Sequence, residues 1–81
     1  MKELEKIIID AFSLNDEVPA SFIIRDHVVK LVRQGVLRED LILLLEEYYY
    51  KFEEEGKELA ADYLLAIMDS LAGFTNSDNL I

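Results

Sequence analysis

The sequence predicts an all-α fold, a small single-domain antiparallel bundle of four amphipathic helices. Apolar residues recur every three or four positions through most of the chain, which is the period of a helix with one buried face. All three glycines, at positions 35, 56 and 73, follow such segments, where glycine commonly ends a helix. The connections between the segments are short, which favours antiparallel packing. An arrangement of three long helices with the first one packed across them is the alternative.

The first two predicted helices occupy residues 2–13 and 19–34. In the first, Ile9 points away from a buried face made of Leu4, Ile7, Ile8, Ala11 and Phe12. The second begins at Pro19, because proline is favoured in the first turn of a helix, and ends before Gly35. Its buried stripe consists of Ile24, Val28, Leu31 and Val32.

The third predicted helix begins at about Glu39, where two acidic residues face the positive end of the helix dipole, and ends at Gly56. Its buried face contains Leu41, Leu44, Leu45, Tyr48 and Phe52, with Ile42 and Tyr49 on the flank.

The fourth predicted helix occupies residues 57–72. Its buried face contains Ala60, Leu64, Ile67, Met68 and Leu71, with Ala61 and Tyr63 beside it, and Asp62 and Asp69 are expected in solvent. The bundle then fills residues 1–74, and residues 75–81 form a short polar tail.

The third helix carries more apolar surface than one buried face requires. Leu43 and Tyr50 fall on the side opposite the predicted core face, and Glu46, Glu47 and Glu54 surround them there. A tyrosine among glutamates can bury its ring in an interface while the charges attract a basic partner. These five residues are therefore the candidate partner-binding site.

The charge of the chain restricts its partners. The 17 acidic side chains outnumber 8 basic ones, giving a formal net charge of −9. Nucleic-acid affinity comes largely from lysine and arginine, so nucleic acid is not expected as a partner, and another protein, in particular a basic one, is favoured. Half of the basic side chains lie in residues 25–38: Arg25, Lys30, Arg33 and Arg38. The first three, on the second helix, are expected to pair with acids of a neighbouring helix.

No pattern in the sequence predicts a catalytic, metal or cofactor site. There is no cysteine and the single histidine, His27, lacks the glutamate partners of a di-metal bundle site. Glu46 and Glu47 point about 100° apart on one helix and cannot clamp a substrate between them. Residues 28–50 have the outline of a helix-turn-helix, but an acidic recognition helix would be repelled by phosphates. An enzyme is therefore not expected.

The expected location is the cytoplasm, because the first residues lack the pattern of a signal peptide and the chain has no cysteine. The longest apolar run, residues 41–45, is far shorter than the ~20 residues that cross a bilayer. The leading hypothesis is a non-enzymatic protein-binding module of the inhibitor, immunity or adaptor type. A self-associating structural or regulatory subunit and a helix-turn-helix regulator are the alternatives, the latter disfavoured by charge.

Overall fold

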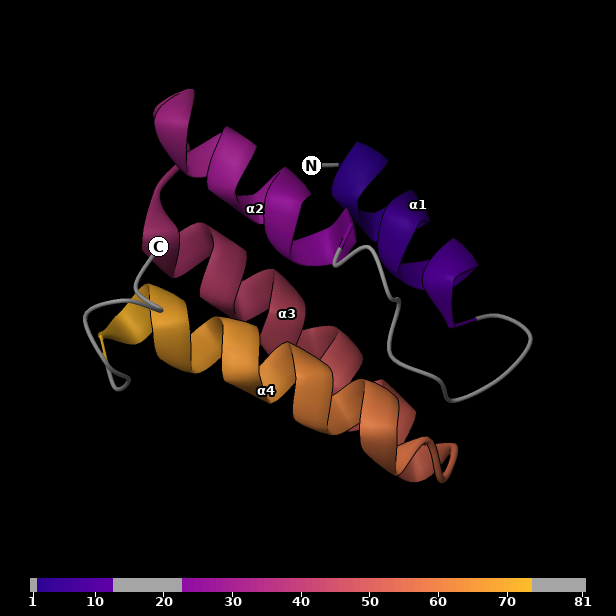
Figure 1. The fold of residues 1–81 in the computed structure, drawn as a ribbon. Coiled ribbons are helices and arrows are strands. Elements are labelled where there is room, and N and C mark those ends of the chain that lie inside the picture. Colours follow the sequence, from indigo (N-terminus) through magenta and orange to yellow (C-terminus); the bar gives the residue numbers. More distant parts are fainter. Residues whose placement is uncertain (1, 13–22, 74–81) are drawn as a thin grey trace.

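The computed structural model of the chain describes residues 2–12 and 23–73, and these residues form four helices and no strand. The helices are α1 (Lys2–Ala11), α2 (Ile23–Arg33), α3 (Arg38–Glu54) and α4 (Glu58–Ala72). They run alternately up and down in two layers, the α1–α2 pair lying on one side of the α3–α4 hairpin (Figure 1). This confirms the predicted four-helix bundle over the version with three long helices. The predicted start of the second helix at Pro19 and the predicted tail lie outside the described residues.

Two glycine turns set the antiparallel order of α2, α3 and α4. Gly35 and Gly56 have φ angles of +95° and +77°, a conformation that residues with a side chain rarely adopt. After α2, the amide of Val36 donates to the carbonyl of Leu31 at 3.0 Å. After α3, the amide of Lys57 donates to the carbonyl of Phe52 at 2.8 Å. These are the hydrogen bonds of a Schellman cap, so both helices end where the sequence predicts.

The core lies between the two layers and agrees closely with the predicted faces. Every residue assigned to the buried face of the fourth helix is buried. On the other three helices, some predicted residues are only half-buried at the edge of the core: Ile7, Ala11, Leu31, Val32 and Leu44. Asp69, expected in solvent, is half-buried, so this prediction is wrong. The fully buried large side chains come from all four helices: Phe12, Leu4, Ile8, Ile24, Leu41, Leu45, Leu64, Ile67 and Val28.

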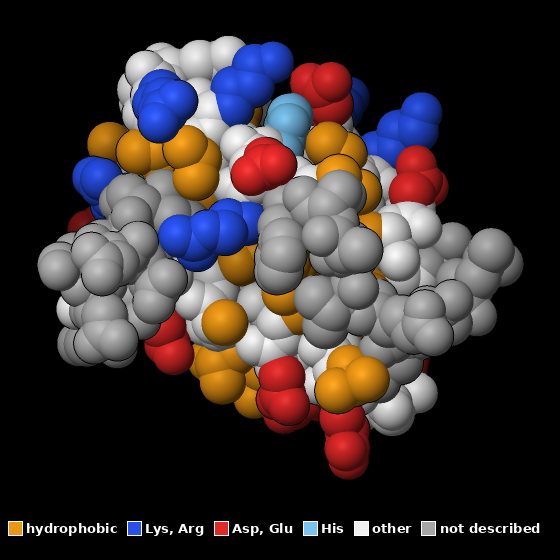
Figure 2. Space-filling view, viewed as in Figure 1, with side chains coloured by type: hydrophobic (Ala, Val, Ile, Leu, Met, Phe, Trp, Pro, Cys, Tyr) orange, Lys and Arg blue, Asp and Glu red, His pale blue; other side chains and the backbone are white. Residues whose placement is uncertain are grey.

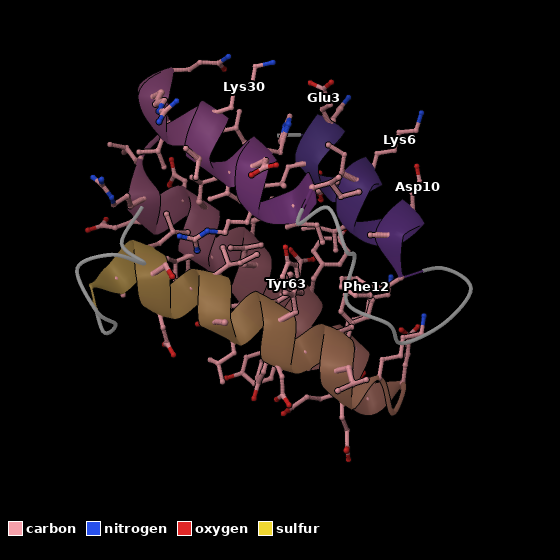
Figure 3. All side chains as sticks on the ribbon, in the orientation of Figure 1. Glu3, Lys6, Asp10, Phe12, Lys30 and Tyr63 are labelled. Carbon is pink, nitrogen blue, oxygen red and sulfur yellow. The ribbon has the colours of Figure 1, made fainter. Side chains whose placement is uncertain are left out.

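Phe12 joins α1 to the hairpin, and Figure 3 shows it beside Tyr63 between the layers. Its ring meets Phe52 edge-on at 5.4 Å and Tyr63 at 6.1 Å between ring centroids. Lys57 Nζ donates to the Phe12 carbonyl at 2.7 Å and lies 5.6 Å from the centre of the Phe52 ring. The positive charge of Lys57 lies at the negative end of the α1 dipole, which is a stabilising arrangement. Lys57 therefore ties the end of α1 to the α3–α4 turn.

Arg25 links the α1–α2 pair to the α3–α4 hairpin. Its Nη1 donates to the Ser70 hydroxyl at 3.2 Å, and that hydroxyl donates to the Ala66 carbonyl at 3.0 Å. Arg25, predicted to pair with an acid of a neighbouring helix, does reach α4, where one of its acceptors is the hydroxyl of Ser70. Ser70 is buried, so this contact satisfies a polar group that burial would otherwise leave at a cost.

The raised pKa values of the core tyrosines Tyr48 and Tyr63 lead us to expect a loss of stability at alkaline pH. Burial raises the pKa of Tyr63, outweighing the backbone amide and guanidinium of Arg25, and burial together with Glu5 raises the pKa of Tyr48. A raised pKa means that the folded chain favours the neutral phenol. This stabilisation is complete below the unfolded pKa of about 10 and is lost as the pH rises through the higher folded value. Urea unfolding between about pH 9 and pH 11 should show this decline.

Tyr63→Phe isolates the contribution of one phenol, because phenylalanine cannot ionise. Its free energy of unfolding should fall less steeply above about pH 10 than that of the parent chain. An identical decline in both proteins would assign the alkaline loss to other groups, such as the lysines.

Candidate interaction surface

The five predicted partner-binding residues lie together on the exposed side of α3. We call Leu43, Glu46, Glu47, Tyr50 and Glu54 the acidic stripe. All five are exposed, with Leu43 at 65% and Tyr50 at 57% of their full accessible surface. Their spacing of three or four residues places them on successive turns over about 16 Å of helix. The predicted position of these side chains is confirmed, and their role in binding stays a prediction.

The core fixes the acidic stripe in place. Leu41 and Leu45 are fully buried on the opposite side of α3, and Phe52 is 4% exposed. The helix therefore cannot turn about its axis without exposing this buried face to water. A rigid helix presents its outer side chains with little loss of backbone entropy on binding.

The ring of Tyr50 packs against the ring of its neighbour Tyr49. The rings of Tyr49 and Tyr50 meet edge-on, with centroids 5.4 Å apart and planes at 69°. Tyr49 itself is half-buried against the core. Its hydroxyl forms a hydrogen bond with Glu53, which is the main reason why the pKa of Tyr49 is raised. Tyr50 thus stands against a fixed ring, and this contact limits the rotamer freedom that binding would remove.

The potential over the α3–α4 hairpin is negative. Residues 38–73 contain ten acidic side chains and three basic ones. Two of these bases lie over aromatic rings of the core. Lys51 Nζ is 5.7 Å from the centre of the Tyr48 ring, and Lys57 Nζ lies over the Phe52 ring. The charge of Asp62 on α4 also raises the pKa of Tyr49, so the acids of both helices act on one region. Figure 2 shows red and orange side chains together along the lower edge of the molecule.

Sequence reasoning missed two exposed apolar side chains on α4. Leu59 is 53% exposed and Leu65 is 39% exposed. The signal was available, since a helical wheel places them about 140° and 100° from Leu64 at the centre of the buried face. They extend the apolar surface of the hairpin beyond the acidic stripe.

A second surface of opposite charge lies at the α2–α3 turn. We call Lys30, Arg33, Leu37 and Arg38 the basic corner. All four are exposed, Leu37 at 64%, and Lys30 points away from the bundle in Figure 3. The Gly35 turn brings the end of α2 next to the start of α3, so residues from both helices gather there. The exposed acids Glu39 and Asp40 follow Arg38 directly, so this turn carries three positive and two negative side chains.

Metal-binding groups and membrane-spanning helices are absent from the described part of the chain. Residues 2–12 and 23–73 contain no group of three or more histidine or acidic side chains that could hold a metal ion. His27 is half-buried on α2, as expected for a residue at the edge of an apolar face. None of the described helices is both long and apolar enough to cross a membrane.

Comparison with known proteins yields no relative, because no protein-family model, curated protein or solved structure matches this chain. The acidic stripe and the basic corner are therefore the features from which a function can be inferred.

Proposed function

We propose that this chain is a non-enzymatic binding module that presents the acidic stripe to the basic surface of another protein. One observation carries the proposal: Leu43 and Tyr50 stand exposed among glutamates on a helix whose other side is held in the core. Apolar and aromatic anchors supply most of the binding energy of an interface, and surrounding charges steer the encounter. A cytoplasmic location belongs to the same proposal, because a chain without cysteine suits a reducing compartment.

Changing Leu43 and Tyr50 together to serine should separate binding from stability. Surface substitutions usually alter the free energy of unfolding by about 0.5 kcal/mol or less, whereas loss of interface anchors should weaken a complex by about 2 kcal/mol or more. Proteins captured from the source cells by the parent chain, and identified by mass spectrometry, should be lost with the double variant. Urea unfolding checks that the variant is folded.

Ile9→Ser is the matched control, since Ile9 is an exposed apolar residue on α1, away from the acidic stripe. This variant should capture the same proteins as the parent chain. Capture that survives the double change would place the binding surface elsewhere. Unfolding by the double change would instead assign Leu43 and Tyr50 to a structural role.

Neutralising the acids of the stripe should act mainly on the rate of association. With Glu46, Glu47 and Glu54 changed to glutamine, encounter with a basic partner should slow and become less sensitive to salt, because charges around an anchor act over distance. Stopped-flow mixing at several salt concentrations measures this. Equal rates for both proteins would show that the partner is not recognised by its charge.

Nucleic acid remains the disfavoured partner under this proposal. The helices α2 and α3, joined by the turn at Gly35, have the order of a helix-turn-helix, but the exposed face of α3 carries the acidic stripe. Phosphates would be repelled there. Salt-sensitive retention on DNA that disappears when Lys30 and Arg33 are changed to glutamine would reverse this view.

A further inference from the structure

The chain carries two surfaces that complement each other. The acidic stripe has three negative side chains around Leu43 and Tyr50. The basic corner has three positive side chains and the exposed Leu37, and with the adjoining acids Glu39 and Asp40 that turn still has a net positive charge. The two surfaces share no residue. In Figure 2 blue side chains gather in the upper part of the view, with red ones among them, while the lower edge shows red and orange side chains.

We propose that the basic corner of one copy docks on the acidic stripe of a second copy, in a head-to-tail contact. This inference rests on the proposed function, because it uses the same stripe as the acceptor. The partner of the stripe is then the basic corner of a second copy of this chain.

The dimensions of the two surfaces agree. Leu43 and Tyr50 are seven residues apart, which is about 10 Å along the axis of α3 and leaves room for one leucine between them. Leu37 lies at a turn, where no helix covers it, and is 64% exposed. With Leu37 seated between the two anchors, the charges of the corner face those of the stripe. Opposite charges brought together in this way favour one register over others.

A two-fold contact between two α3 helices is the competing arrangement. In an antiparallel pair with Leu43 opposite Tyr50, the two-fold axis passes between Glu46 and Glu47, so Glu46 of each copy would face Glu47 of the other. Like charges at the centre of an interface oppose association. A head-to-tail contact avoids this and leaves one corner and one stripe unused at the ends, so the assembly can continue to grow.

The net charge of −9 on each copy opposes association at long range. At physiological ionic strength the Debye length is about 8 Å, so repulsion between distant groups is largely screened while groups in contact still attract. The contact is therefore expected near 0.15 M salt and should weaken when the salt is lowered enough to restore repulsion.

Sedimentation of four purified proteins tests the proposal. The parent chain, 9.4 kDa as a monomer, should show a mean mass that rises with concentration and passes that of a dimer. A stripe variant carries Leu43→Ser and Tyr50→Ser, and a corner variant carries Lys30→Gln, Arg33→Gln and Leu37→Ser. Each should weaken association about thirtyfold and remain monomeric alone. Circular dichroism checks folding, and serine is favoured at position 37, which is the N-cap of α3.

The fourth protein controls for net charge. This variant, Lys2→Gln with Lys6→Gln, loses two positive charges, as many as the corner variant, but from exposed positions on α1. It should associate like the parent chain. An equal loss of association in this control would attribute the effect of the corner variant to net charge and overturn the corner as a docking site.

Mixing the stripe variant with the corner variant gives the sharpest result. Each retains one intact surface, so the mixture should form a pair of twice the monomer mass and grow no further. A mixture that stays monomeric would overturn the head-to-tail contact, and so would parent chains that stop at a dimer or variants that still associate alone. A parent chain that is monomeric up to about 1 mM would end the self-association proposal. Capture of a different protein through the stripe would still support the proposed function.

Discussion

Phe12→Ala is expected to lower the free energy of unfolding by about 3–5 kcal/mol, the cost of truncating a buried phenylalanine. The side chain is fully buried and meets the rings of Phe52 and Tyr63 edge-on, so the substitution removes aromatic pairing as well as apolar contact. A chain of 81 residues has a total stability of about 4–12 kcal/mol, so a large share would be lost. Urea unfolding followed by circular dichroism measures the change.

Ile9→Ala on α1, the helix that Phe12 directly follows, is the control, because Ile9 is 47% exposed and its truncation should cost far less. A loss below about 1 kcal/mol for Phe12→Ala would mean that α1 is not docked through this residue. A partial loss of helical signal, with the rest of the bundle still folded, would mean that α1 alone is released.

The helices and their buried faces could be predicted because each face repeats with a single period over several turns. The acidic stripe follows from the same reasoning, since Leu43 and Tyr50 fall opposite a face that contains Leu45 and Phe52. The glycine caps could be predicted as well, because few residues other than glycine adopt the conformation needed at Gly35 and Gly56.

Contacts between helices far apart in the chain could not be predicted in this way. The packing of Phe12 on Tyr63, and the hydrogen bonds from Arg25 to Ser70 and from Lys57 to the Phe12 carbonyl, depend on which helices adjoin. Periodicity describes each helix alone and contains no information on its neighbours.

The basic corner shows a further limit of sequence reasoning. The cluster of bases in residues 25–38 was visible, but its members separate in the structure. Arg25 lies between the layers on Ser70, whereas Lys30, Arg33 and Arg38 are exposed around Leu37. Only the turn at Gly35 determines which of them share a surface.

Leu45→Ala and Leu43→Ala form the most direct test of the orientation of α3, because the same truncation is made two residues apart on opposite sides of one helix. Leu45 is fully buried at the centre of the core face, and its truncation should cost about 2–5 kcal/mol, enough to unfold a small domain. Leu43 is 65% exposed, and its truncation should change the free energy of unfolding by no more than about 0.5 kcal/mol.

Helix propensity cannot account for such a difference, since both substitutions replace leucine by alanine within α3. Urea unfolding of the two variants beside the parent chain measures it. Similar costs at both positions would mean that both sides of α3 are covered, and the acidic stripe would then be part of the core. A larger cost at Leu43 than at Leu45 would reverse the orientation of the helix and place the binding surface on its other side.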